Sequence, residues 1–141
     1  MTTAILWPVF ALVALIFSVW VQVPVKRLAH IKANPPARED FATGAAGKRY
    51  FASVDQPADN LANLFEMPVL FFALVPLLLI TRHAGTVEVA LAWVFVALRA
   101  VHSIIHTGGN VVRVRFMVYL ASCAVLSAMW LGFALDIATG R

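Results

Sequence analysis

The sequence predicts an all-α integral membrane protein built as a four-helix bundle. Of its 141 residues, 62% are hydrophobic and 13% are charged, whereas soluble domains average roughly 45–50% apolar and about 25% charged residues. Four apolar stretches each approach the roughly 20 residues that a helix needs to cross about 30 Å of hydrocarbon. They cover residues 4–25, 61–80, 87–105 and 116–137. Stretches of this length exclude the shorter strands of an outer-membrane barrel, and the chain length predicts a single domain over residues 1–141.

Each stretch has its own boundary signals. The first lacks a preceding positive region and is too long for a signal peptide, so we expect it to be retained as a span. The second and third are joined by a tight turn at 81–86, which predicts antiparallel neighbours. Gly108-Gly109 indicates the end of the third helix.

The connection at about 26–60 is long for so small a bundle. Its Asn34-Pro35-Pro36 and Gly44-Ala45-Ala46-Gly47 stretches predict that helices are interrupted there. Two interpretations remain open: a partly irregular loop, and a lid over a site at that end of the bundle.

Lysine and arginine are concentrated at one end of the predicted bundle. The 26–60 connection holds Lys26, Arg27, Lys32, Arg38, Lys48 and Arg49, and the connection after the third span adds Arg113 and Arg115. By the positive-inside bias, we expect this end to face the cytoplasm and both termini to face outward, as in a bacterial inner membrane. The net charge of +4 then reflects topology and contact with membrane lipids rather than nucleic acid.

Two polar stripes interrupt the apolar spans. In the second span, Asn63 and Glu66 follow Asp59 at helical spacing, and a carboxylate at this depth implies a partner within the protein. In the third, Arg99, His102 and His106 share one helical face. With the later Asn110 and Arg113 they lie within roughly 80° of each other. The helix directions place both stripes in the cytoplasmic third of the bundle.

These stripes have three explanations. The first is a buried ion pair between Glu66 and Arg99 that joins helices. The second is an anionic ligand, with lipid phosphate an equal candidate, because one acid does not neutralise Arg99, Arg113 and Arg115 together. A metal held by His102, His106 and Glu66 is disfavoured because the arginines repel a cation, so no metal is predicted.

The order and depth of these motifs resemble the MAPEG family (membrane-associated proteins in eicosanoid and glutathione metabolism). The similarity comprises Asn63-x-x-Glu66-x-Pro68, Arg99-x-x-His102-x-x-x-His106 and Arg113 before the fourth span. The resemblance implies a homotrimer that binds glutathione between subunits. It assigns thiolate stabilisation to Arg113. It assigns glutathione binding to Asn63, Glu66, Arg99, His102, His106 and, at the end of the first span, Arg27.

The function that the resemblance implies is a glutathione-dependent transferase or peroxidase, acting on lipophilic small molecules that enter from the bilayer. The sequence departs from the family pattern at Asp59, where an arginine is frequent, and at His102 and His106, where tyrosines are frequent. These departures keep an alternative open: a non-enzymatic protein of the same fold that binds lipid or acts as a scaffold.

Overall fold

The computed structural model describes residues 3–140, and all regular structure in that range is helical. Four segments are long and apolar enough to cross a membrane, as the sequence predicts. Three are single helices: α1 (Leu6–Ala33), α5 (Thr86–Thr107) and α6 (Val112–Thr139). The second segment consists of two helices, α3 (Gln56–Leu64) and α4 (Met67–Ile80).

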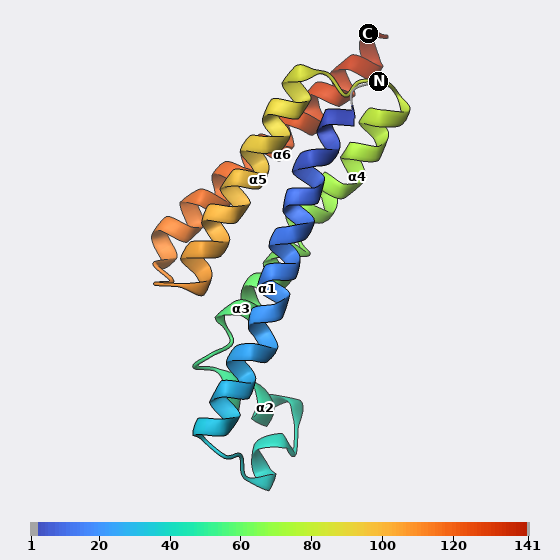
Figure 1. Cartoon of the computed structure of the whole chain (residues 1–141). Helices are drawn as coiled ribbons and strands as arrows, with labels where there is room; N and C mark the ends of the chain where they lie inside the picture. Colours follow the sequence, from blue (N-terminus) through green and yellow to red (C-terminus); the bar gives the residue numbers. More distant parts are fainter. Residues whose placement is uncertain (1–2, 141) are drawn as a thin grey trace.

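The long helices lie side by side, with the α5–α6 hairpin next to α1 (Figure 1). α1 begins and α6 ends at the same end of the bundle, whereas the small helix α2 (Gly44–Phe51) lies beyond the other end (Figure 1). α5 packs mainly against α6 and also contacts α1 and α3, so it occupies the most enclosed position. Polar side chains on α5 are therefore shielded on several sides.

The connection between α1 and α3 is more helical than its composition predicts. α1 continues to Ala33 and stops where Asn34 precedes Pro35, because a residue before proline disfavours the helical conformation. The expectation that the Gly44–Gly47 stretch interrupts a helix is wrong: α2 begins at Gly44. Its start is stabilised by Thr43, whose hydroxyl accepts a hydrogen bond from the backbone N–H of Ala46 at 3.1 Å. A short 3-10 helix, η2 (Arg38–Phe41), precedes it, and another, η1 (Thr3–Ile5), precedes α1.

The second span is broken at Glu66, which the sequence interpretation as one continuous helix did not anticipate. Pro68 lies in the first turn of α4. Its ring has no N–H to donate to the carbonyl of Leu64 and collides with that carbonyl in a continuous helix. Glu66 has φ −91° and ψ −102°, outside the helical region. Asn63 and Glu66 therefore do not share one regular helical face.

An apolar core fills the half of the bundle nearer the termini. Phe71 of α4 and Phe95 of α5 stack with ring centroids 5.0 Å apart, and both side chains are fully buried. Buried residues from α1 and α6, including Leu12 and Leu126, complete this core. The buried polar residues of α5 lie toward its other end, so the bundle divides into an apolar half and a polar half.

Substitution of Phe71 by alanine is expected to lower the free energy of unfolding by about 3 kcal/mol, the low end for a buried phenylalanine. The value is at the low end because lipid, unlike water, already solvates an apolar ring. Denaturant titration in detergent micelles measures it. Phe10→Ala, whose ring is 57% exposed, is the matched control and should change stability by less than about 0.5 kcal/mol. Equal losses in both variants would contradict this description of the core.

Candidate functional site

The buried polar face of α5 is the centre of the candidate site. Arg99, His102, Ser103 and His106 are all buried and recur at intervals of three and four residues. This spacing places them on one side of the helix. The sequence prediction that Arg99, His102 and His106 share a face is confirmed, and Gly108 ends α5 where the glycine pair predicted.

The side chain of Arg99 is fully buried. None of its three guanidinium nitrogens has a hydrogen-bond partner within residues 3–140. Its Cζ atom lies 5.0 Å from the centre of the Tyr119 ring on α6, a cation–π arrangement that stabilises the charge only partly. A buried charge without a hydrogen-bonded anion is costly. The site therefore has an unmet requirement for a negatively charged group.

The two histidines extend this face toward the end of α5. The His102 and His106 rings meet edge to face at 5.5 Å between centroids. His102 also lies 5.9 Å from the Tyr119 ring. The Nδ1 atoms of both histidines lack hydrogen-bond partners in the described chain. These nitrogens are further polar groups able to bind a ligand.

Glu66 does not form the ion pair with Arg99 that was considered from the sequence. Its side chain is exposed beside the α3–α4 break. The only ion pair within residues 3–140 joins Arg27 and Asp55, with 2.8 Å between Nη2 and Oδ1. Within residues 3–140, neither Glu66 nor Arg99 therefore has an ion-pair partner.

A pocket of about 240 Å³ lies beside the α5 polar face. It brings together Asn63 of α3, His102 of α5, and Arg115 and Tyr119 of α6. Arg115 is held by Asn110, whose side-chain oxygen accepts a hydrogen bond from Nη1 at 2.7 Å. The pocket therefore combines an amide, an imidazole, a phenol and a guanidinium.

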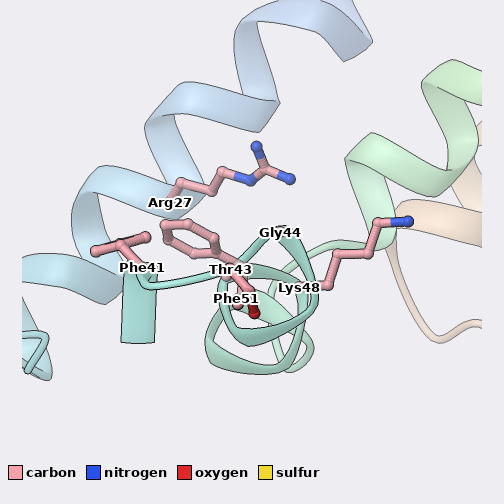
Figure 2. Close-up of a pocket in the computed structure, with 7 residues that line it drawn as sticks. Arg27, Phe41, Thr43, Gly44, Lys48 and Phe51 are labelled. Carbon is pink, nitrogen blue, oxygen red and sulfur yellow. The ribbon is translucent and has the colours of Figure 1, made fainter. Parts of the chain in front are cut away.

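Arg113 and Arg27 do not line this pocket. Arg113, the predicted thiolate-stabilising residue, is exposed on the first turn of α6. Arg27 lines a second pocket between α1 and α2, where its Cζ atom lies 4.9 Å from the centre of the Phe51 ring (Figure 2). Within a single chain, Arg27 is therefore separated from the pocket that contains Asn63 and His102.

Three buried or partly buried polar residues at the site were not predicted from the sequence: Ser103, Asn60 and Tyr119. Asn60 of α3 is fully buried, and its side-chain oxygen accepts a hydrogen bond from the Ser103 hydroxyl at 3.4 Å. Tyr119 contacts both Arg99 and His102. One available signal was the position of Tyr119 four residues after Arg115, which places both on one face of α6. Asn60 had a comparable signal, four residues before Leu64 on the buried face of α3.

The arrangement suits an anionic ligand better than a metal ion. Within residues 3–140 no three His, Cys, Asp or Glu side chains are close enough to hold a metal. Buried Arg99, with Arg115, Asn63 and His102 nearby, offers donors for a carboxylate or thiolate. The fold and this site define a helical integral membrane protein with a polar pocket, next to the buried Arg99, in one half of the bundle.

The chain belongs to the MAPEG family, whose model matches residues 5–135. The match covers nearly the whole chain and includes every residue of the candidate site. Comparisons with curated proteins and with solved structures gave no match.

Proposed function

We propose that this protein is a glutathione-dependent transferase or peroxidase that acts on lipophilic electrophiles. The observation that carries the proposal is Arg99, a fully buried guanidinium without a hydrogen-bond partner in the described chain. Glutathione has two carboxylates and a thiol, and a carboxylate is the natural bidentate partner of a guanidinium. Membership of the MAPEG family supports the same ligand.

The roles of the site residues follow from their chemistry. Arg99, Asn63, Glu66, His102 and His106 bind the tripeptide. The carboxylate of Glu66 is suited to its amino group and the other four to its carboxylates and amides. Arg27 lines a different pocket and has no part in this assignment.

Arg113 stabilises the glutathione thiolate. A thiol with a pKa of about 8.5 is mostly protonated at neutral pH, and a nearby cation lowers that pKa. The resulting thiolate then attacks the electrophile.

We further propose that the active form is a homotrimer. Glu66 is exposed near the middle of the second span, next to Phe65, whose side chain is 60% exposed. An ionised carboxylate facing hydrocarbon is costly, whereas a cleft between subunits supplies polar surroundings. The same cleft accommodates exposed Arg113. The site is therefore completed by a neighbouring copy of the chain.

An apolar pocket supports a lipophilic second substrate. It has a volume of about 340 Å³ and is lined by residues of α1, α3 and α4, including Trp20 and Leu61, and by Phe65 between α3 and α4. Leu61 and Asn63 lie on the same short helix, so this pocket and the polar pocket share α3. A substrate dissolved in the bilayer is able to enter laterally here. In this proposal the cationic end of the bundle faces the cytoplasm of a bacterial inner membrane.

Native mass spectrometry of the detergent-solubilised protein, titrated with glutathione to millimolar concentration, tests both proposals. We expect a trimer that gains glutathione, with the retained tripeptide lost in the Arg99→Met variant. A trimer that does not bind glutathione but retains anionic lipid in the pocket that contains Asn63 and His102 would instead support the non-enzymatic alternative. A monomer that binds glutathione normally would reject the intersubunit site.

A further inference from the structure

The second pocket, between α1 and α2, has the features of a phosphate-binding site. It has a volume of about 350 Å³ and is lined by two cations, Arg27 and Lys48, by the start of α2, and by two aromatic rings, Phe41 and Phe51 (Figure 2). It shares no lining residue with the pocket assigned to glutathione, which contains Asn63 and His102. Its chemistry therefore needs a separate explanation.

Arg27 is held in position with donor capacity to spare. Its Nε and Nη2 atoms both contact Oδ1 of Asp55, at 2.9 and 2.8 Å. The guanidinium also packs over the Phe51 ring. These contacts fix the plane of the group and leave Nη1 available to a further acceptor. Asp55 thus orients Arg27 without occupying all its donors.

The start of α2 provides a backbone donor in the same pocket. Of its first N–H groups, those of Ala46 and Gly47 are bound by the side chain and the backbone carbonyl of Thr43. The N–H group of Gly44, which lines the pocket, has no acceptor within residues 3–140. A Cβ atom at Gly44 would meet nothing within 4 Å, so the approach to this backbone is open. Free N–H groups at a helix start favour an anion.

Lys48 adds the second cation from the next turn of α2. Figure 2 shows its side chain extending from α2, while Arg27 reaches toward α2 from α1. The Lys48 amine has no ion-pair partner in the described chain. Because Asp55 offsets one of the two charges, the pocket keeps a net positive charge. A phosphate group, with several oxygens and at least one negative charge, matches this set of donors.

The pocket lies at the level where the spans end. Lys26, adjacent to Arg27, donates a hydrogen bond from Nζ to the backbone carbonyl of Thr107, the last residue of α5, at 3.3 Å. Lipid headgroups occupy the few ångströms beyond the hydrocarbon on each side of a bilayer. Leu28 beside Arg27 and Phe41 in the pocket wall are both more than half exposed. Such apolar surface suits the glycerol and acyl part of a lipid rather than a water-soluble phosphate.

We propose that the pocket between α1 and α2 binds the phosphate group of an anionic membrane lipid. The proposal does not depend on glutathione binding. Arg27 and Lys48 contact the phosphate oxygens, the Gly44 N–H group donates to them, and Phe41 contacts the apolar part of the lipid. Lipid bound here would join α2 to the membrane surface at the end of α1.

Native mass spectrometry in detergent, with phosphatidylglycerol or phosphatidylcholine of identical acyl chains as probes, tests this site. The protein should retain phosphatidylglycerol preferentially, and Lys48→Gln should weaken that retention about tenfold, or about 1.4 kcal/mol. Lys48→Arg should restore it. The matched control is Arg49→Gln, which removes the same charge from the next residue of α2, outside the pocket. It should change retention by no more than about twofold, below the effect of one cation near a lipid surface.

Three outcomes would overturn the proposal. Equal losses in Lys48→Gln and Arg49→Gln would show diffuse attraction to surface charge rather than a site. Release of the lipid by millimolar inorganic phosphate would assign the pocket to a soluble phosphate compound. Release of the lipid by glutathione would show that the pocket between α1 and α2 binds glutathione. Size-exclusion profiles and helical circular dichroism identical to the parent protein establish that Lys48→Gln is folded, and Lys48→Arg tests the charge directly if it is not.

Discussion

Arg99→Met is expected to weaken glutathione binding about 100-fold while leaving the ligand-free protein at least as stable as the parent. Losing one partner of a buried, hydrogen-bonded charge pair costs about 2–5 kcal/mol, so affinity for glutathione should fall by about 100-fold, or about 3 kcal/mol. In the absence of ligand, the same substitution should not destabilise the protein. The guanidinium is buried without a hydrogen-bond partner in the described chain, and an apolar side chain in its place avoids the desolvation cost of that charge, so the free energy of unfolding should be unchanged or higher.

Thermal unfolding of the parent protein and of Arg99→Met in detergent, with and without millimolar glutathione, measures both the stability of the ligand-free protein and its stabilisation by glutathione. Arg82→Met is the control. It also removes one positive charge, but from an exposed turn at the other end of the second span, and should alter neither quantity. If Arg99→Met is strongly destabilised without ligand, Arg99 is a structural residue and the proposed function loses its main support. If the variant keeps its stabilisation by glutathione, the tripeptide binds elsewhere.

Much of the site was predictable because α5 is a regular helix. Regular geometry converts sequence spacing directly into position on a face. The interval of three between Arg99 and His102, and of four between His102 and His106, therefore sufficed to place them together. The end of the helix at the glycine pair followed from the same local chemistry. The number of spans was equally accessible, because it depends only on length and hydropathy.

The remainder depended on contacts between segments or on a break in regularity. Pro68 was visible in the sequence, yet proline in the first turn of a helix is compatible both with a new helix and with a kinked continuous one. Only the packed structure shows that α3 and α4 separate and leave Glu66 exposed. Likewise, the helix at Gly44 depends on the Thr43 cap, which offsets the low helix propensity of two glycines.

The separation of Arg27 from the polar pocket also depends on a contact between two segments of the chain. The family resemblance implied that Arg27 shares the glutathione site, but its side chain is positioned by Asp55, 28 residues later in the chain. No periodicity connects two residues in different elements. Long-range pairs of this kind determine which pocket a cation lines, and they are the part of a site that spacing does not encode.

The two arginines at the start of α6 provide the sharpest test of the catalytic assignment. Arg113→Met should lower the turnover of glutathione conjugation by about 10²–10³-fold, the usual effect of removing one electrostatic stabiliser. It should also remove the ultraviolet absorbance of the bound thiolate, with little change in the KM for glutathione. Arg115 lines the pocket and is fixed by Asn110, so Arg115→Met should mainly raise that KM and leave the absorbance of saturated enzyme intact.

This contrast follows from where the two side chains lie. Arg113 is exposed in one chain, so it reaches a thiolate only if a neighbouring subunit forms the opposite wall of the site. Arg115 acts within its own chain. Disrupting the trimer should therefore reproduce the Arg113→Met phenotype and not that of Arg115→Met. If instead Arg115→Met eliminates the thiolate absorbance and Arg113→Met does not, the thiolate lies inside a single subunit. In that case Arg115, and not Arg113, stabilises the glutathione thiolate.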